Sequence, residues 1–286
     1  MSVLQNKIDF VAFISVEHAN PNGDPLAGNR PRDTVEGLGE ISDVCIKRKI
    51  RNRLQDMGEP IFVKSNDRCD DGCASLKDRA ENCSKLKELL KGKNTDGELY
   101  AKAACEEWTD VRAFGQVFAF KGKGKSDGVS VGIRGPVTIH PAFSLSSVEI
   151  ESIQITKSVN GESQGGGKSS DTMGTKHRVK FGIYELKGSI NCQLAEKTGF
   201  TEEDAEKIKT AVATLFENDC SSARPEGSMC IEKLFWFKHN NKTGQYPTAK
   251  VHRSVIAKPL CDEPKAASDY TFMYDNSLEG LEPEVI

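Results

Sequence analysis

The chain opens with a hydrophobic run that stops at a dense turn signal. Residues 8–16 are mostly apolar, β-branched or aromatic, a pattern that predicts a buried strand. The run is followed by Asn20-Pro21-Asn22-Gly23-Asp24-Pro25, in which proline fixes φ, glycine permits positive φ, and the Asn and Asp side chains can bond the local backbone. We therefore predict a strand that ends in an ordered loop.

Helical periodicity is present in two later segments. Residues 41–57 predict a helix that ends before Gly58, and residues 201–216 predict a second helix with Thr201 as its N-cap. The first helix is expected to bury Ile41, Val44, Cys45, Leu54 and Met57, with Ile50 near the edge of this stripe, and to carry Lys47, Arg48, Lys49, Arg51 and Arg53 on its other faces. The second is expected to bury Ala205, Ile208, Val212, Leu215 and Phe216.

Strand-like runs occupy most of the remaining chain. They predict strands at residues 114–120, 129–139, 147–156, 181–192, 229–238 and 250–258. Residues 74–91 and 98–108 interrupt this series with two predicted helices. The order strand–helix, then strands, then strand–helix–strand predicts an α+β fold with a ferredoxin-like core and two insertions.

The second insertion is an arm, residues 157–180, with little apolar periodicity. It is rich in Gly and Ser and contains five basic residues against Glu162 and Asp171. Between two strands, such a segment predicts a long hairpin that packs no core of its own. From composition alone, an unstructured loop without a function fits equally well.

Length and composition narrow the functional classes. A chain of 286 residues is long enough to bury a core without disulfides, and its nine cysteines are odd in number, so we expect reduced thiols. No stretch approaches the roughly 18 apolar residues of a membrane span, and residues 1–14 lack a signal-peptide pattern. We therefore expect a cytoplasmic protein without membrane contact.

The net charge of −3 conceals an uneven distribution. Residues 262–286 hold seven acids and one lysine, so the rest of the chain is net positive, and residues 30–53 contain seven basic residues. Gly28, Asn29, Arg30 and Arg32 offer backbone NH groups, an amide and two guanidinium groups, which suit a phosphate or a polyanion. A loop with a purely structural role is an equally open interpretation.

Two nucleotide-binding patterns and one metal pattern are incomplete. Ala119 and Glu162 stand where a P-loop would require glycine before Gly124-Lys125-Ser126 and Gly167-Lys168-Ser169, so nucleotide hydrolysis is excluded. Cys69, Cys73 and Cys83 lack the paired spacing of a zinc site, and we expect neither a metal nor another cofactor. Whether these three thiols bind a metal is a question for the structure.

One combination of motifs resembles a known family. The first strand, the Asn20–Pro25 turn, Gly28-Asn29-Arg30-Pro31-Arg32 and the basic helix are followed by Asp110-Val111-Arg112-Ala113-Phe114-Gly115 and Gly135-Pro136-Val137. Together they resemble the backbone subunit of the CRISPR surveillance complex Cascade, the seventh Cas protein family of the RAMP superfamily, most closely its subtype I-C branch. The resemblance extends over nearly the whole chain.

The resemblance implies a hand-shaped α+β protomer that grips guide RNA. Its ferredoxin-like (RRM-like) palm would comprise residues 1–60, 110–156 and 181–286, its helical fingers residues 61–109, and its long β-hairpin thumb residues 157–180. RNA would contact the loop, the basic helix and the thumb. The residues expected there are Asn20, Asn22, Gly23, Asn29, Arg30, Arg32, Lys47, Arg48, Arg51, Lys168, Met173, Lys176 and His177.

The same resemblance implies a non-enzymatic function within an assembly. The protein would bind CRISPR RNA (crRNA), meet target DNA through pairing to that guide, and associate head to tail with copies of itself as a helical filament. Its other partners would be the fifth-family cap subunit, the large subunit and the small subunit. The aromatic RNA-recognition signature is absent, which favours a grip on phosphates that is independent of base sequence.

Two other functions stay open from sequence alone. Some RAMP relatives cleave RNA, so a RAMP-type endoribonuclease would draw on Asp33 or on the histidines His18, His140, His177, His239 and His252. No motif pairs any of these histidines with a base or a nucleophile, and Asp33 is more simply a partner for Arg30 or Arg32. A general single-strand-binding protein would require more aromatic residues than the 7% present.

Overall fold

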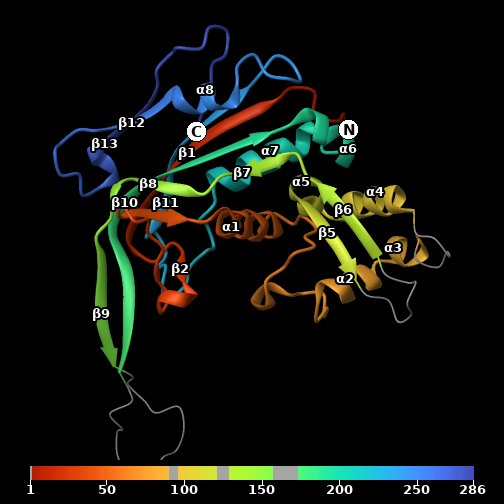
Figure 1. Ribbon diagram of the computed structural model, residues 1–286, viewed down its shortest axis with the longest axis horizontal. Coiled ribbons are helices and arrows are strands. Elements are labelled where there is room, and N and C mark those ends of the chain that lie inside the picture. The colour runs from red at the N-terminus through yellow and green to blue at the C-terminus, as the bar shows by residue number, and fades with distance from the viewer. Residues whose placement is uncertain (1, 90–95, 121–128, 157–172) are drawn as a thin grey trace, which may run out of the picture.

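The computed structural model describes residues 2–89, 96–120, 129–156 and 173–286. Its largest element is an antiparallel sheet with the order β14-β11-β1-β10-β8-β4, in which β7 and β9 also pair with β10 (Figure 1). The strands are β1 (Ile8–Ala19), β4 (Leu38–Ile41), β7 (Val137–Ile139), β8 (Ala142–Ser147), β9 (Ile150–Thr156), β10 (Met173–Ile190), β11 (Met229–Lys238) and β14 (Glu284–Val285).

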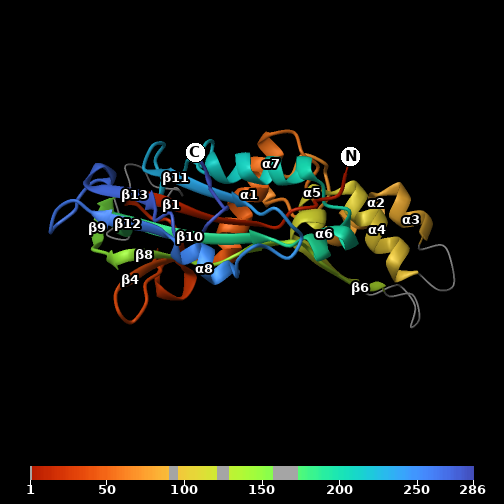
Figure 2. The same ribbon diagram turned by 90° about the horizontal axis from the view of Figure 1, so that it is seen from above.

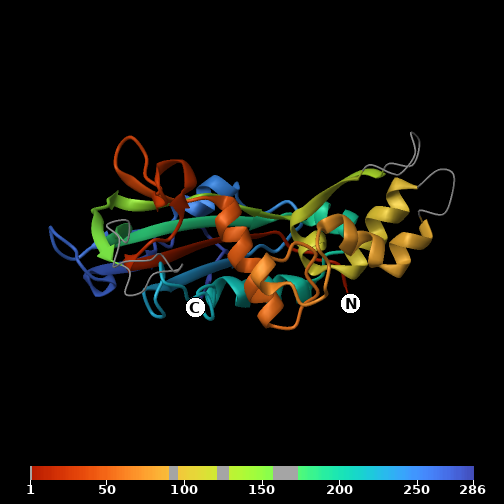
Figure 3. The same cartoon turned by 90° about the horizontal axis from the view of Figure 1, so that it is seen from below.

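The strand β1 is buried on both faces, which explains its nearly continuous apolar sequence. Phe10 and Ile14 face the larger hydrophobic core, whereas Val11 and Phe13 face a second core on the opposite side. Helices α1 (Asp43–Asp56), α6 (Cys192–Thr198) and α7 (Glu202–Ala213) cover the first side, which we call the α1 face (Figure 3). The second side, the α8 face, is covered by α8 (Thr248–Arg253), β12 (Val255–Pro259) and β13 (Tyr270–Tyr274) (Figure 2).

A third hydrophobic core lies at one end of the molecule (Figure 1). It gathers aromatic rings around Phe118, whose centroid is 5.0 Å from that of Phe62 and 5.3 Å from that of Tyr100. The elements that build it are α2 (Leu76–Asn82), α3 (Ser84–Leu89), α4 (Gly97–Glu107), α5 (Thr109–Phe114), β5 (Gly115–Phe120) and β6 (Val129–Arg134). The core therefore joins the helical insertion to the hairpin that follows it.

The Asp-Val-Arg-Ala-Phe-Gly motif connects this end to the sheet layers. Asp110 accepts hydrogen bonds from the backbone NH of Phe62 (2.7 Å) and from Nε of Arg51 in α1 (2.9 Å). Arg112 forms a two-bond pair with Asp204 of α7, at 2.8 and 2.7 Å. Both carboxylates are buried and each has a cationic partner. The motif thus fixes the end of the molecule that contains the third core, which we call the helical end, against α1 and α7.

The strand β10 is longer than predicted and continues into the arm. It begins at Met173 rather than at Phe181, and its first residues pair with β9 in an antiparallel register from Met173↔Thr156 to Val179↔Ile150. The paired segments, residues 150–156 and 173–180, form a ribbon that projects away from the sheet (Figure 1). The other predicted arm residues, 157–172, lie outside the described residues.

Three predicted elements are wrong in part, each because of a local break or a burial demand. The helix predicted at 74–91 is divided into α2 and α3 by extended backbone at Cys83 (φ −70°, ψ 115°). The strand predicted at 129–139 is interrupted at Gly135, where a Cβ would lie 2.3 Å from the carbonyl oxygen of Ala113. Residues 250–253 are helical rather than extended, because Val251 and His252 are both buried on the α8 face. No helix within the described ranges is long and apolar enough to cross a membrane.

The apolar stripe predicted for α1 is wrong in part. Leu54 is buried, and Cys45 and Met57 pack against the larger core as expected. The helix begins after Ser42, its N-cap, because Ile41 belongs to β4. Its buried residues are Ile46, Lys49, Ile50 and Leu54, whereas Val44 is 67% exposed. The buried stripe therefore includes a lysine that was expected on a solvated face.

The prediction for α7 is confirmed. Thr201 caps the helix, and its hydroxyl and backbone form a reciprocal capping box with Asp204. Ala205, Ile208 and Val212 are buried against the sheet as expected. This helix is specified by local signals, which explains why sequence periodicity was sufficient to locate it.

Candidate nucleic-acid interface

The loop after β1, residues 20–37, is held by the side chains of its own asparagines. Buried Asn20 donates from Nδ2 to the carbonyl oxygen of Asn29 (2.7 Å). Asn22 Oδ1 accepts hydrogen bonds from the backbone N (3.0 Å) and the Oγ (2.8 Å) of Ser42. Because Ser42 is the N-cap of α1, these bonds fix the loop to the start of the helix. We call residues 20–37 the N-terminal loop.

Two further positions shape the tip of the N-terminal loop. Asn29 adopts a left-handed backbone conformation (φ 62°), and its side chain lies against Gly23. A Cβ at Gly23 would be 2.0 Å from Oδ1 of Asn29, so the tip requires glycine there. Asn20, Asn22, Gly23 and Asn29, all predicted at RNA, thus have structural roles within the loop.

The two loop arginines have different surroundings. Arg32 Nη2 lies 3.6 Å from Oδ1 of Asp24, both partly exposed. The side chain of Arg30 has no hydrogen bond or ion pair with any residue that the structure describes. Asp33, the expected partner of one of them, is exposed and pairs with neither within the described ranges. The Arg30 guanidinium is therefore free to bind an anion.

The basic side chains of α1 divide into structural and free groups. Arg51 is bound to Asp110 and stacks on the ring of Phe114, 5.0 Å from the ring centroid. Lys47 pairs with Asp43 one turn earlier at 3.0 Å. Arg48 is exposed, and its side chain has no hydrogen bond or ion pair in the described part of the chain. Of the three helix residues predicted at RNA, Arg48 alone is both exposed and unpaired.

The ribbon carries the described arm residues that were predicted at RNA. Met173 is 62% exposed at the outer end of the ribbon. His177 Nδ1 lies 2.9 Å from Oγ of Ser152 across the two strands, and Lys176 Nζ donates to the carbonyl oxygen of Ser222 (2.6 Å). Lys168 lies outside the described residues.

Glu151 of β9 and Glu149, just before this strand, neutralise the remaining cations of the ribbon. Arg178 Nε donates to Glu151 (2.8 Å) and Lys180 Nζ donates to Glu149 (2.9 Å). The hydrogen bond from Arg178 lowers the pKa of Glu151 below its ordinary value. Arg178 and Lys180 are thus less suited to phosphate than their charges alone suggest.

A segment that the sequence analysis missed lies beside these residues. The loop between α7 and β11, residues 214–228, contains Asp219, which accepts a hydrogen bond from buried Lys49 of α1. Burial lowers the pKa of Lys49, and the nearby Asp219 carboxylate opposes that effect. The Gly, Pro and Ser residues of this loop indicate a turn but give no sign of its position. Only the fold brings it next to α1.

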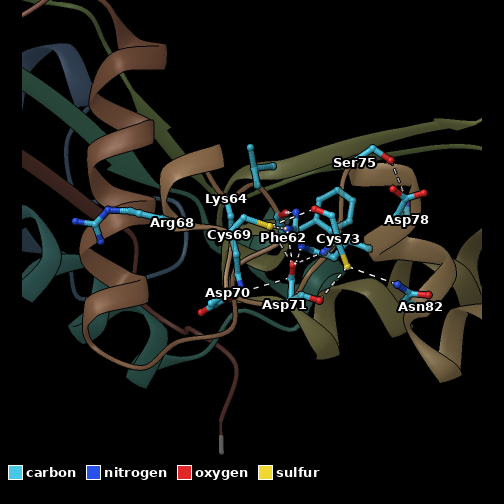
Figure 4. A network of polar contacts seen from close by, with 12 residues as sticks. Phe62, Lys64, Arg68, Cys69, Asp70, Asp71, Cys73, Ser75, Asp78 and Asn82 are labelled. Atoms are coloured by element: carbon cyan, nitrogen blue, oxygen red, sulfur yellow. Dashed lines mark hydrogen bonds and ion pairs between the residues drawn. The ribbon is translucent and has the colours of Figure 1, made fainter.

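Cys69 and Cys73 belong to a network of polar contacts (Figure 4). Cys69 Sγ lies 3.3 Å from Oδ1 of Asp71 and 3.4 Å from Nη2 of Arg79. Arg79 also donates two hydrogen bonds to Asp71, at 2.6 and 3.0 Å, and holds the pKa of that carboxyl well below its usual range. Asn82 contacts Cys73 Sγ at 3.6 Å. Across the residues that the structure describes, no three His, Cys, Asp or Glu side chains are grouped to hold a metal ion.

The histidines mainly support the fold. Buried His239 contacts Asp9 at 2.9 Å, and buried His252 contacts the carbonyl oxygen of Gly188 at 3.0 Å. Exposed His18 lies 3.7 Å from Glu151. The contact between His177 and Ser152 has no described carboxylate to orient the imidazole.

Comparison with known proteins agrees with the resemblance seen in the sequence. A protein of Haloferax volcanii described as "CRISPR-associated protein Cas7" is 29% identical over 239 residues, which cover 76% of this chain and 66% of the relative. The chain thus spans slightly less than two thirds of that relative's length.

Two chains of solved structures were also matched to this one. One chain, from a "CRISPR RNA-guided surveillance complex, pre-nicking", is 14% identical with a TM-score of 0.46, over 84% of this chain and 83% of that one. Another, from a "CRISPR RNA-guided surveillance complex", is 18% identical with a TM-score of 0.41, over 81% and 68% of the two chains.

The family of this protein is identified by a family model that matches almost the whole sequence. The family model described as "CRISPR-associated protein Cas7" matches residues 6–275. This range includes β1, the N-terminal loop, α1, the helical end, the ribbon and the α7–β11 loop. The protein therefore belongs to the CRISPR-associated Cas7 family.

Proposed function

We propose that this protein is a guide-RNA-binding backbone subunit of a Cascade surveillance complex, and that it carries the RNA without cleaving it. It polymerises head to tail along crRNA, which pairs with target DNA, and contacts the fifth-family cap subunit, the large subunit and the small subunit. Membership of the Cas7 family supports this proposal. The subtype I-C-like assignment is part of the same proposal.

The proposal assigns the fold to three parts of a hand. The central sheet with its covering helices is the RRM-like palm, residues 61–109 are the fingers, and the arm is the thumb. The ribbon, which extends β10 beyond the sheet, supports the thumb assignment because it projects from the palm on continuous β structure.

One observation carries the proposal: Arg30 and Arg48 are two unpaired guanidinium groups, among the described residues, on elements that are fixed to each other. The bonds between Asn22 and Ser42 tie the N-terminal loop, which holds Arg30, to α1, which holds Arg48. Guanidinium groups recognise phosphate by charge and geometry and are indifferent to base identity. A guide carrier requires this kind of grip.

The first experiment measures RNA affinity as a function of salt. We expect Arg30→Ala with Arg48→Ala to weaken binding equally for guides of unrelated sequence, and to flatten the slope of log K against log salt by about 0.7 per phosphate contact removed. Arg253→Ala is the matched control, because Arg253 is an exposed arginine at the end of α8 on the other face. Unchanged affinity and slope in the double variant would show that these residues do not bind RNA.

A second experiment tests the rival function, a RAMP-type endoribonuclease. Short RNA of uniform length should copurify with the protein from cells that express it, and the purified complex should leave a repeat hairpin and a guide-bound target intact. The substitutions His177→Ala and Asp33→Ala should then have no activity to remove. Cleavage that stops in either variant would establish the nuclease instead.

A further inference from the structure

The α7–β11 loop contacts all three elements of the proposed RNA surface. The carbonyl oxygen of Ala223 accepts from the backbone N of Asn20 in the N-terminal loop (2.9 Å). Lys49 of α1 donates to Asp219, and Lys176 of the ribbon donates to the carbonyl oxygen of Ser222 (2.6 Å). The N-terminal loop, α1 and the ribbon therefore all meet on one loop that is distant from them in sequence.

Arg224 is held in this loop by one side of its guanidinium group. Its Nε donates to Oδ2 of Asp219 (3.0 Å), the oxygen that also accepts from Lys49. Its backbone is fixed by a pair of hydrogen bonds with Ser221, at 2.8 and 3.1 Å. The terminal nitrogens Nη1 and Nη2 have no partner among the described residues, and 28% of the side chain is exposed.

The charge of Arg224 is not cancelled by its carboxylate. Asp219 accepts from two cations, Lys49 and Arg224, so the three groups together keep a positive charge. Of the other acids in the loop, Glu217 is bound to Arg53 of α1, and Glu226 is exposed. The free edge of the guanidinium group is thus oriented in advance, which reduces the entropy lost when it binds an anion.

We propose that Arg224 is a further phosphate-binding residue and that the α7–β11 loop forms a third side of the RNA path, beside the N-terminal loop and α1. This inference rests on the proposed function, because the anion it assigns to Arg224 is a guide-RNA phosphate. The loop also connects the palm to the ribbon, through the hydrogen bond from Lys176 to Ser222.

The direct test compares the RNA affinity of Arg224 variants with that of the unmodified protein and of the Arg253→Ala control. Arg224→Ala should weaken binding of single-stranded RNA about tenfold, the effect of losing one charge-assisted contact, and flatten the salt slope by about 0.7. Arg224→Lys, which keeps the charge but cannot hold Asp219 and a phosphate with one planar group, should be intermediate. Arg253→Ala should bind as the unmodified protein does. Because Asp219 keeps Lys49 as partner, we expect Arg224→Ala to retain its melting temperature.

The natural thiol Cys220 gives a test that needs no substitution. Cys220 and Cys261 are both exposed, the first in the α7–β11 loop and the second after β12. A short RNA that occupies one protomer should slow the alkylation of Cys220 by N-ethylmaleimide severalfold and leave Cys261 unaffected. The two residues can be followed separately by peptide mass spectrometry.

The outcomes separate this inference from the proposed function. If Arg30→Ala with Arg48→Ala loses affinity, whereas Arg224→Ala binds normally or Cys220 stays fully reactive, the third side is wrong and the guide-carrier function stands. If none of these variants changes RNA affinity, the proposed function itself fails. If Arg224→Ala does not fold, Arg224→Lys and the protection of Cys220 decide the question.

Discussion

The two faces of the central sheet use polar side chains in opposite ways. On the α8 face, Asp9 accepts from His239 (2.9 Å) and pairs with Lys7 (3.0 Å), and Lys7 also donates to Thr248 (2.7 Å). The backbone N of Gln245 donates to Nδ1 of His239, so the imidazole proton is on Nε2 and points to Asp9. These polar groups bind one another and leave little for a ligand.

The α1 face leaves several polar groups free for other molecules. The side chains of Arg30 and Arg48 and the terminal nitrogens of Arg224 have no hydrogen-bond or ion-pair partner in the described part of the chain, whereas Lys49 and Arg51 of α1 are largely buried in ion pairs with Asp219 and Asp110. The number of basic residues in a segment does not tell the free side chains from the paired ones. Residues 30–53 contain both kinds, and Arg224 lies in a loop whose sequence does not indicate a binding role. What distinguishes a binding surface here is the absence of an internal partner, not the density of charge.

The largest predicted effect is on the α8 face. Asp9→Ala should lower the free energy of unfolding by about 3–5 kcal/mol, because it leaves Lys7 and His239 buried without their shared acceptor. Burial alone would raise the pKa of Asp9, but hydrogen bonds from His239 and Lys7 bring it below its ordinary value, which shows that the charged form is the one the fold stabilises. Urea denaturation at neutral pH measures the change.

The control for this substitution is Glu263→Ala. Glu263 lies 3.6 Å from Lys265, and both side chains are largely exposed, so its removal should leave the free energy of unfolding unchanged. RNA binding by Asp9→Ala, measured where the protein is folded, should be near normal. Loss of RNA binding in a folded Asp9→Ala protein would contradict the division between the two faces.

A smaller effect is expected in the N-terminal loop. Asn22→Ala removes both hydrogen bonds to Ser42 and should lower the free energy of unfolding by about 2 kcal/mol. It should also weaken RNA binding, because Arg30 is no longer fixed relative to α1. Ser152→Ala on the ribbon removes one exposed contact with His177 and should change stability by less than about 0.5 kcal/mol. Equal effects of the two substitutions would show that the loop is not ordered by Asn22.

The sequence predicted those parts of the molecule that local chemistry determines. The turn after β1 was predicted because Pro, Gly and Asn restrict the backbone wherever they stand, and α7 because Thr201 and Asp204 cap it locally. The family motifs located the loop and the basic helix. The contacts of these residues with RNA stay predictions, to be decided by the affinity measurements.

The sequence did not predict what depends on distant partners. Lys49 was placed on a solvated face because its partner, Asp219, is 170 residues away along the chain. The α7–β11 loop was overlooked for the same reason, since its turn residues do not reveal its contacts with Asn20 and Lys176. Residues 250–253 resemble a strand in composition but lie in α8, where Val251 and His252 are buried.

The α8 face should also make the stability of the protein depend on pH, through His252. Burial lowers the pKa of His252 from its ordinary 6.5, although its contact with Gly188 and the nearby Asp9 oppose this, and His140 and Lys187 add to it. A lowered histidine pKa means that the unfolded chain takes up a proton before the folded one does. Stability should thus be complete above about pH 6.5 and fall as the pH decreases below that value.

The variant His252→Gln isolates this contribution. The Gln amide can still donate a hydrogen bond to the carbonyl oxygen of Gly188 but does not titrate, so the slope of unfolding free energy between about pH 7 and 5.5 should be smaller than in the unmodified protein. Asp9 titrates in a more acidic range and does not obscure the comparison. An unchanged slope would mean that His252 is not the group responsible.

Deletion of the arm should not destabilise the protein. Thr156 and Met173 are paired in the ribbon, so residues 157–172 can be replaced by Asn-Gly, the two-residue turn that suits an antiparallel hairpin. Each halving of a loop is worth about 0.6 kcal/mol of closure entropy, so this shortening should raise the free energy of unfolding by about 2 kcal/mol or less. Phe120 and Val129 are paired in the same manner, and replacing residues 121–128 by Asn-Gly gives a matched control.

The two deletions differ in what the proposed thumb predicts for assembly. If the arm is the thumb, its deletion should give a folded monomer that binds RNA weakly and forms no regular multi-copy assemblies on guide RNA in electron micrographs, whereas the control should still assemble. The ribbon supports this expectation because its two strands stay paired out to Thr156 and Met173, the residues between which the deletion is made. Normal filaments from the arm deletion would show that copies associate through the palm and fingers alone. The free cations of the α1 face would then account for RNA binding, and the ribbon would have no part in assembly.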